Sequence, residues 1–344
     1  MKIKGAISLA LSTFIAMTSA LVAFGDESNL TKVKVPYSDD IYIVSNPDGE
    51  RVGHPNTGTQ YLEDNNSNRL TGDYMYITPL SAKNGLYQVS IPAGHSDCWQ
   101  GVIRLTDDGV VTYQEPGMDW YHCIEKDDMA IYFSIYNREY GKPLDYYDVN
   151  GELIENLGVY AKANGISLER SDWAEDAVKY AWDGNFMPPT IGYNYRKIIT
   201  RKEFCTLAVM LADRGKTEIK NCTSPYTDVD DYYVSLASAY GIVSGVGDGK
   251  FEPDRAITRQ EAAVLLCNLA DYIGNSYDTE QRSRFNDDSS IAPWAKESVY
   301  KICGTKSETG TYVMEGVGSN SFSPLTGYTR EQAIVTVYRL AYQN

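Results

Sequence analysis

Two hydrophobic patterns divide this chain of 344 residues. From about Leu30 to Leu157, apolar and polar residues alternate in short segments rich in Tyr, Val and Ile, which is typical of half-buried strands. Seven short strands with turns between them favour a β-sandwich or a β-barrel. The predicted strands are 41–44, 74–77, 86–91, 102–105, 110–113, 130–135 and 145–147.

Turn signals separate these segments. The residues Asp107–Gly109 and Asn150–Gly151 predict hairpin turns, because Asp-Gly and Asn-Gly pairs tolerate the positive φ that tight hairpins require. The polar run Asp64–Asn68 has no apolar period, so we predict a solvent-exposed loop there.

A helical pattern replaces the alternating one in the second half of the chain. Three segments align there without gaps, and each carries a Thr-Arg pair, at Thr200, Thr258 and Thr329. Apolar residues follow each pair at the spacing of one helix face, so we predict an amphipathic helix after each Thr. The aligned sets include Phe204, Ala262 and Ala333; Cys205, Ala263 and Ile334; Leu211, Leu269 and Leu340; and Ala212, Ala270 and Ala341.

Each Thr also opens a capping box with the residue three positions later. The partners are Glu203, Glu261 and Gln332. In such a box the Thr hydroxyl accepts a hydrogen bond from the N–H of its partner, while the partner's side chain accepts one from the Thr N–H. Three boxes therefore predict three helix starts.

The approach to each box repeats as well. An aromatic residue stands seven positions before the Thr, at Tyr193, Phe251 and Phe322, and a Pro follows it in the last two segments. The capping threonines are 58 and 71 residues apart, which is enough for a two-helix unit with its loops. We predict three such units that bury one another's apolar faces.

These residues resemble the S-layer homology (SLH) repeat. Its units carry an aromatic-x-Asp motif, a first helix with a Trp, and a Thr-Arg-x-Glu box that opens a second helix. The aromatic-x-Asp motif is matched by Tyr226–Asp228 and Phe285–Asp287, and the Trp by Trp173 and Trp294. The resemblance covers about Ser171 to Asn344. It implies an all-α domain of three SLH repeats with pseudo-threefold packing.

The resemblance also implies a ligand. In the resembled family, grooves between the repeats bind secondary cell wall polysaccharide, which often bears pyruvate ketals, and the Arg of the box contacts it. The matching residues here are Arg201, Arg259 and Arg330. Each occupies the first helical position, where free N–H groups and the helix dipole favour an anion. An isolated Arg at such a position normally extends into solvent, but three equivalent ones favour a carboxylate site.

The resemblance places three further residues in the ligand site: Trp173, Asp228 and Asp287. Helix capping is an alternative role for the two aspartates. If the arginines contact the ligand, their replacement by Ala is expected to weaken wall binding and to leave stability nearly unchanged, because Ala is a good helix former. The middle repeat is expected to show the largest effect.

This chain departs from the family pattern in each repeat. The first lacks the aromatic-x-Asp motif and the Pro, the second has Tyr232 in place of Trp, and the third has an insertion around Lys306 to Glu315. These departures concern individual ligand contacts more than the fold.

Residues 1–25 have the features of a secretory signal. Lys2 and Lys4 precede an apolar run, and small residues suit cleavage before Asp26. An uncleaved anchor is the alternative, but small and hydroxylated residues interrupt the run. We see no second span, lipidated Cys or C-terminal anchor signal, so we expect an exported protein that the SLH repeats retain.

The charge of the chain restricts its partners. It has 46 acidic and 31 basic residues, a net charge of −15, and cleavage of the signal would make it −17. This balance argues against nucleic acid, which requires a basic surface. It also means that an anionic wall polymer needs local positive charge in defined pockets.

All three histidines, His54, His95 and His122, lie in the N-terminal half. His95 and His122, with Cys98 and Cys123, are residue types that bind zinc, but their spacing is irregular. A disulfide between Cys98 and Cys123 is favoured because the protein is exported. A Cys98 thiol nucleophile is the enzymatic alternative, although the sequence shows no orienting group for it.

The remaining chemistry-bearing residues have structural interpretations. Cys205 and Cys267 align with mostly apolar residues, so we predict buried free thiols, whereas Cys222 and Cys303 receive no role. The acidic clusters at 228–231 and 286–288 lack a complete set of calcium ligands and are interpreted as solvated helix starts. We expect no metal and no cofactor.

The sequence thus predicts a multidomain chain, an all-β module followed by the SLH domain. The expected function is an exported surface protein bound non-covalently to secondary cell wall polysaccharide, with a non-catalytic β module that is structural or binds a ligand. The alternative is a wall-anchored hydrolase with its active site in that module. The expected divisions are a signal at 1–25, the β module at 26–157, a linker at 158–170, and SLH repeats at 171–215, 226–274 and 285–344.

Overall fold

The structure is a computed structural model that describes most of the chain after the N-terminal 29 residues. The proposed signal therefore lies outside the described residues. At 91–93, 97–99, 114–117 and 134 only the backbone is described. The described residues are 30–35, 38, 40–47, 58–93, 97–117, 121–134, 145–214, 220, 222–275 and 283–341.

The chain forms two compact units. One is mainly β-structure from the residues before Glu155, and the other is mainly helical and contains most residues from Glu155 onward. No helix in the described part of the chain combines the length and the apolar character needed to cross a membrane.

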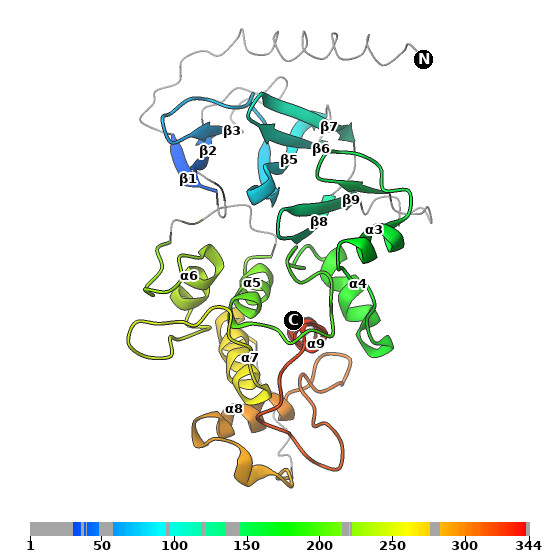
Figure 1. Ribbon diagram of the computed structural model, residues 1–344. Coiled ribbons are helices and arrows are strands. Elements are labelled where there is room, and N and C mark those ends of the chain that lie inside the picture. The colour runs from blue at the N-terminus through cyan, green and yellow to red at the C-terminus, as the bar shows by residue number, and fades with distance from the viewer. Residues whose placement is uncertain are drawn as a thin grey trace. The chain divides into compact units, whose positions relative to one another are not determined.

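The β unit contains three antiparallel sheets (Figure 1). Their strand orders are β1-β2-β3, β4-β5-β6-β7 and β10-β9-β8. A short 3₁₀ helix, η2 (Ala82–Asn84), joins β4 to β5. The strands are β1 (Thr31–Lys34), β2 (Ile41–Asn46), β3 (Thr59–Asp64), β4 (Tyr76–Ser81), β5 (Leu86–Ala93), β6 (Asp97–Thr106), β7 (Gly109–Gly117), β8 (Tyr121–Lys126), β9 (Met129–Ser134) and β10 (Tyr146–Asp148).

Both faces of the four-stranded sheet carry buried side chains. Successive side chains of a strand point to opposite faces, so one strand contributes to two separate hydrophobic cores. On one face Tyr87 and Ile103 pack with Ile43 and Leu62 of the β1–β3 sheet. The other face belongs to a second core, which joins the four-stranded sheet to the β8–β10 sheet. Its buried members are Leu80, Leu86, Val102, Tyr121, Cys123, Ala130 and Tyr132.

Each of the seven predicted strands overlaps an observed one, but β4 begins and ends later than predicted, and β6 and β7 are about twice as long as predicted. The turns at Asp107–Gly109 and Asn150–Gly151 and the loop after Asp64 are confirmed too. Three strands were missed. β1 is short and carries two lysines, β3 has a mixed pattern, and β8 is buried over its first four residues, which hides the alternation.

The helical unit contains seven α-helices and two short 3₁₀ segments among its described residues (Figure 1). One of them, α3, occupies the first part of the stretch that the sequence suggested as a linker. The elements are α3 (Leu157–Ala163), η3 (Asp172–Ala174), α4 (Glu175–Asp183), α5 (Arg201–Ala212), α6 (Tyr232–Ala239), α7 (Arg259–Ile273), η4 (Asp288–Ser290), α8 (Pro293–Gly304) and α9 (Arg330–Ala341).

The three capping boxes are confirmed. Helices α5 and α7 begin at complete boxes formed by Thr200 with Glu203 and by Thr258 with Glu261. At α9, the N–H of Thr329 donates to Gln332 Oε1 at 3.0 Å, and the N–H of Gln332 donates to the Thr329 hydroxyl at 3.3 Å. We call α5, α7 and α9 the box helices.

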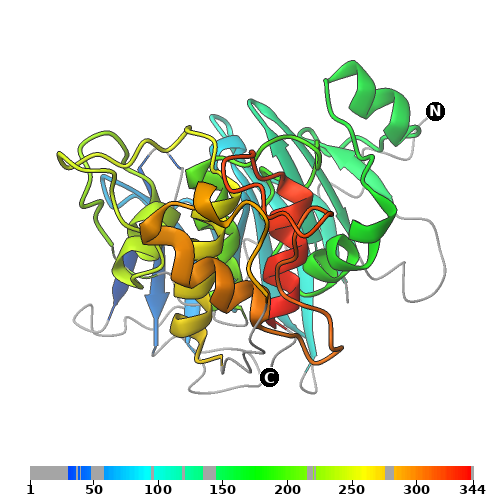
Figure 2. The same ribbon diagram turned by 90° about the horizontal axis from the view of Figure 1, so that it is seen from below.

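The helices that precede the box helices, α4, α6 and α8, are called the first helices. Each packs mainly on the box helix of a different segment: α6 on α5, α8 on α7, and α4 on α9. Figures 1 and 2 both show the orange α8 beside the yellow α7. The box helices also contact one another. No two-helix segment is thus self-contained, and each completes its core with a neighbouring segment.

Three backbone hydrogen bonds close a circuit just before the box helices. The N–H of Ile199 donates to the Tyr328 carbonyl at 2.8 Å, that of Tyr328 to the Ile257 carbonyl at 3.0 Å, and that of Ile257 to the Ile199 carbonyl at 3.2 Å. All three side chains are buried. The three sequence-related segments therefore meet at one buried centre.

Candidate functional site

A four-residue turn lies six positions before each capping Thr. We call these turns the box turns: 194–197, 252–255 and 323–326. Each begins with a non-glycine residue in the left-handed region, where φ is 48° at Asn194, 58° at Glu252 and 57° at Ser323. This conformation is uncommon for such residues. Its occurrence at three aligned positions shows that the turns have the same backbone shape.

Two of the box turns line surface pockets. The first turn does so together with Ser167 and Glu169. The third does so together with Asp287 and Ser290. Because the pockets form at aligned positions of related segments, they are the natural candidates for a repeated binding site.

The box helix of another segment holds each turn. At the first turn, the N–H of Arg330 donates to the Lys197 carbonyl at 2.9 Å, and that of Glu331 donates to the Tyr195 carbonyl at 2.8 Å. The N–H groups of Arg201 and Lys202 bind the second turn in this way, and those of Arg259 and Gln260 bind the third. These are the first-turn N–H groups that the sequence analysis left available to an anion. That argument is wrong, because carbonyl oxygens already accept from them.

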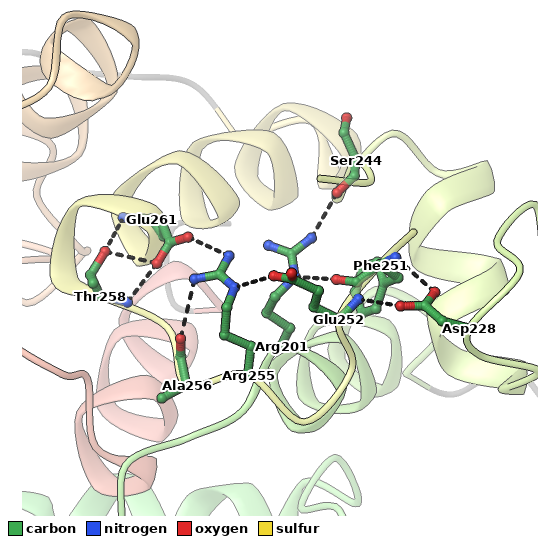
Figure 3. Close-up of polar contacts among 9 residues, drawn as sticks. All are labelled: Arg201, Asp228, Ser244, Phe251, Glu252, Arg255, Ala256, Thr258 and Glu261. Carbon is green, nitrogen blue, oxygen red and sulfur yellow. Dashed lines mark hydrogen bonds and ion pairs between the residues drawn. The ribbon is translucent and has the colours of Figure 1, made fainter. Parts of the chain in front are cut away.

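The three predicted site arginines are buried rather than extended into solvent. Arg201 donates from Nε to the Phe251 carbonyl at 2.8 Å and from Nη2 to the Ser244 carbonyl at 2.8 Å, as Figure 3 shows. Its guanidinium carbon lies 4.4 Å from the centre of the Phe251 ring. The side chain thus binds a loop of the following segment through two main-chain oxygens and an aromatic face.

Arg259 repeats this arrangement one segment later. It donates to the Phe322 carbonyl at 2.8 Å and to the Glu315 carbonyl at 2.6 Å, and lies over the Phe322 ring. Ser244 and Glu315 occupy aligned positions, so the two contacts are equivalent.

Arg330 closes the series on the first segment. It donates to the Tyr193 carbonyl at 2.8 Å and to Glu203 Oε1 at 2.5 Å, and lies over the Tyr193 ring. Burial of all three side chains contradicts the expectation that replacement by Ala leaves stability nearly unchanged. A contact between these arginines and a ligand remains a proposal.

Asp228 and Asp287 shape the second and third turns. Asp228 accepts from the N–H groups of Phe251 and Glu252 at 2.8 and 2.9 Å, as Figure 3 shows. Asp287 accepts from those of Phe322 and Ser323 at 2.8 and 2.7 Å. The helix-cap interpretation is wrong for both, since Asp231 caps α6 and Asp287 makes no capping hydrogen bond to η4.

These backbone donors affect the ionisation of both carboxyl groups. The hydrogen bond from the Glu252 N–H, with that from Phe251, holds the pKa of Asp228 below its usual value. For Asp287, partial burial acts to raise the pKa, but the N–H groups of Phe322 and Ser323 outweigh it, so the pKa is lowered. Both residues are therefore poised to stay charged and to hold their loops at neutral pH.

The sequence missed the residues that fix the first helices beside the box turns. Gln260 Oε1 accepts from the N–H of Ala292, which precedes α8. Glu331 accepts from both the N–H and the hydroxyl of Ser171, which precedes η3. Both residues stand two positions after a capping Thr, but the first segment has Lys202 there, so the shared position does not indicate their distant partners. Their contacts join the N-terminal end of a first helix to the helix that holds a box turn.

A tryptophan follows each of these two contacts in the sequence. Trp173 follows Ser171 by two residues, and Trp294 follows Ala292 by two. Their exposed fractions are 56% and 60%, which is high for indole side chains. Both indole side chains therefore lie largely at the surface of the helical unit.

The structure describes only some of the residues for which a disulfide, a zinc site or a thiol nucleophile was considered in the β unit. His54, His95 and the Cys98 side chain lie outside the described residues, so a Cys98–Cys123 disulfide and a Cys98 nucleophile remain predictions. Cys123 and His122 are buried neighbours in β8. In the described part of the chain, no three His, Cys, Asp or Glu side chains gather where a metal could bind.

Two structural cysteines are located as predicted. Cys205 is a buried free cysteine in α5, and Cys267 is buried in α7. Burial raises the pKa of both thiols, that of Cys267 to about 11. Both are thus protonated at neutral pH and poor nucleophiles.

Comparison with known proteins agrees with this geometry. Residues 225–263, which include the second box turn and the box of α7, match the S-layer homology domain family. The chain therefore contains a segment that matches the SLH domain family.

Similar proteins include Exoglucanase XynX of Acetivibrio thermocellus, 28% identical over 91% of this chain and 29% of that protein. The Surface-layer 125 kDa protein of Lysinibacillus sphaericus is 27% identical over 49% of this chain and 14% of its own. An Endoglucanase of Bacillus sp. (strain KSM-635) is 26% identical over 51% and 18%. The chain spans less than a third of each of these relatives.

Proposed function

We propose that the helical unit consists of three SLH repeats in pseudo-threefold packing, which hold the protein non-covalently on the cell wall by binding secondary cell wall polysaccharide. The observation that carries this proposal is the circuit among Ile199, Ile257 and Tyr328. In this circuit each segment is joined to another by a backbone hydrogen bond at aligned residues. The circuit includes all three segments, whereas the family match covers only the second. We further propose that the repeats span 171–215, 226–274 and 285–344.

The binding sites of this proposal are three grooves. Each groove has a box turn on one wall and the start of a first helix, with its aromatic residue, on the other. The aromatic residues are Trp173 in the first groove, Tyr232 in the second and Trp294 in the third. Aromatic faces suit a sugar ring, which presents apolar C–H groups between its hydroxyls.

The three arginines are proposed to serve the ligand mainly by holding the grooves. Each one fastens the loop before a box turn to the neighbouring repeat, as Arg201 does with Ser244 and Phe251. Asp228 and Asp287 fasten the same loops from the other side. A polysaccharide, with or without pyruvate ketals, would then meet a rigid turn.

For the β unit we propose a layered, sandwich-like module without catalytic activity. Its polar array supports a structural role: Gln88 donates to Gln100, Gln100 donates to Ser90, and Gln88 accepts from the Tyr121 N–H. These polar groups hydrogen-bond to one another on the face of the four-stranded sheet that carries the second core. The hydrolase alternative is favoured by the names of relatives such as Exoglucanase XynX and Endoglucanase.

Sedimentation with purified cell wall tests the anchoring function. The full chain without residues 1–25 is expected to sediment with wall that retains its secondary polysaccharide and to stay in solution with wall stripped of that polymer by hydrofluoric acid. Equal binding to both walls would refute the proposal. Release of reducing sugar from β-glucan or xylan by the same preparation would instead favour the hydrolase.

A further inference from the structure

We infer that Asn150 is a self-modifying site: its side-chain amide is hydrolysed without an enzyme, and the carboxylate that results pairs with Arg104. Three Asn-Gly pairs occur in the sequence, at Asn84, Asn150 and Asn164, and the structure describes all of them. The hydrogen bonds around these pairs single out Asn150. The modification lies in the β unit and does not depend on wall binding.

The reaction needs only the chain itself and water. The main-chain nitrogen of Gly151 attacks Cγ of Asn150 and forms a C–N bond, and the side-chain nitrogen leaves as ammonia with the proton that Gly151 loses. Water then opens the cyclic imide and leaves an aspartate or an isoaspartate. No electron donor or acceptor takes part. Glycine favours the attack because it has no Cβ to crowd the nitrogen.

Arg104 of β6 lies against the oxygen of the amide that reacts. Its Nη1 donates to Asn150 Oδ1 at 2.9 Å and to the Val149 carbonyl at 3.1 Å, and lies 3.4 Å from the Tyr113 hydroxyl. Negative charge develops on Oδ1 when Cγ is attacked, and a guanidinium already held against that oxygen stabilises the charge. Arg104 therefore lowers the barrier to the attack of Gly151.

The other two Asn-Gly pairs are held in a different way. Asn84 donates from Nδ2 to the Ser81 hydroxyl at 2.8 Å, and Asn164 donates from Nδ2 to the Tyr160 carbonyl at 2.8 Å. Both side chains are half-buried, and no described residue donates to their Oδ1 atoms. Asn150 is exposed, and its Nδ2 makes no hydrogen bond to a described residue. The nitrogen that leaves as ammonia is thus bound at two of the pairs and unbound at Asn150.

The main chain imposes the same constraint at all three pairs. The N–H groups of Gly85, Gly151 and Gly165 donate to the carbonyl three residues earlier, at 3.0, 3.0 and 3.1 Å. Each turn must therefore open before the glycine nitrogen can attack, so this hydrogen bond does not distinguish the sites. The surroundings of the asparagine side chain are what differ.

The product suits its surroundings better than the amide does. Arg104 is half-buried, and among the described residues it has neutral partners and no ion pair. A carboxylate at position 150 would add Coulomb attraction to the hydrogen bond that is already present. Val149 and Tyr113 pack against the second core. The new ion pair would therefore fasten the turn after β10 to the four-stranded sheet.

Peptide mapping by mass spectrometry tests the site. The purified chain is kept in mildly alkaline buffer, folded or in urea, and each Asn-Gly peptide is followed for the mass change of NH2 replaced by OH. In the folded chain, Asn150 should react about tenfold faster than Asn84 and Asn164, as for one added charge-assisted hydrogen bond in the transition state. In urea the three rates should converge. Equal rates in the folded chain, or the same ranking in urea, would overturn the inference.

Replacement of Arg104 tests its part in the reaction. In R104Q the rate at Asn150 should fall to about that at Asn84, because the cation beside Oδ1 is lost. In R104K part of the native rate should remain, since the positive charge is kept. An unchanged or higher rate in R104Q would overturn the role of Arg104.

The product is tested without waiting for the reaction. N150D should raise the melting temperature by about 2 °C in the native chain and should not raise it in R104Q, as expected for an ion pair at a half-buried arginine. The matched control is N84D, which loses the hydrogen bond to Ser81 and should gain no stability. Absence of a gain from N150D, or an equal gain in R104Q, would overturn the pairing with Arg104.

Discussion

Arg330 binds Glu203 across 127 positions of sequence, with Nη2 and Nε lying 2.5 and 3.4 Å from the carboxylate oxygens. The arginine is 2% exposed and the glutamate 13%. The same carboxylate completes the capping box of α5 by accepting from the Thr200 N–H. One side chain therefore serves a local motif and a contact between the last and the first segments.

The other two segment contacts are built differently at this position. Glu261, the counterpart of Glu203, pairs with Arg255 of its own segment, and the third counterpart is the neutral Gln332. The ion pair between Arg330 and Glu203 is thus particular to the closure of the circuit. Removal of this ion pair should therefore destabilise the helical unit more than removal of the ion pair between Arg255 and Glu261.

Replacing Arg330 by Ala should destabilise the helical unit by about 3 kcal/mol, because it leaves the largely buried Glu203 without its positive partner. Chemical denaturation of the full chain, followed by the far-ultraviolet signal of the helices, measures this. A change below about 0.5 kcal/mol, the usual size for an exposed residue, would show that the side chain is not buried in solution.

Glu203→Gln separates the ion pair from the capping box. Gln stands at the equivalent position of the third box, so the box should survive while Arg330 loses its partner, at a cost of about 2 kcal/mol. The matched control is Glu261→Gln, whose partner Arg255 is 37% exposed and whose loss should cost less than about 1 kcal/mol. Equal losses in the two variants would contradict this ranking.

Thr258→Ala should cost about 1 kcal/mol of stability, because it removes the hydroxyl that accepts from the Glu261 N–H at the start of α7. Thr258→Ser keeps a capping hydroxyl and serves as the control. Wall binding should change only as far as unfolding reduces the folded population. A loss of binding without a fall in the melting temperature would assign the hydroxyl to the ligand instead.

The helical unit should lose stability in acid through Asp228 and Asp287. Hydrogen bonds from backbone N–H groups lower the pKa of each below the unfolded value of about 3.9. The stabilisation they provide is therefore complete above that pH and is lost as the pH falls through the folded pKa. In D228N/D287N, stability at neutral pH should be lower and the fall below about pH 4 should be shallower.

Asp254→Asn is the control for this experiment, because Asp254 makes no hydrogen bond or ion pair within the described part of the chain. Its melting temperature should follow the same pH curve as that of the native chain. If the stability of D228N/D287N falls in acid as much as that of the native chain, other carboxylates cause the loss of stability.

Cysteine accessibility should follow burial. In the folded protein, iodoacetamide at neutral pH should leave Cys205 and Cys267 unmodified and should label the half-buried Cys222. Mass spectrometry without reductant should recover Cys98 and Cys123 in one disulfide-linked peptide. Alkylation of Cys98 before reduction would exclude the bond and favour the thiol nucleophile.

The local elements could be predicted from the amino-acid sequence. Hydrophobic period, capping chemistry and turn residues act over a few positions, so they identified seven strands and the starts of α5, α7 and α9. Alignment of the three boxes also predicted that the segments would share one structure. β8 escaped because a strand buried on both faces has no alternation to detect.

The contacts of the aligned polar residues, in contrast, depend on how the three segments pack together. The position of Arg201 at the start of a helix predicted an exposed guanidinium, yet its partners lie more than forty residues away in the next segment. The same holds for Gln260 and Glu331, whose acceptor oxygens hold the starts of distant first helices. Polar partners fixed by the packing of separate segments leave no periodic signal in the sequence, because any residue of suitable hydrogen-bonding type at any distance can supply them.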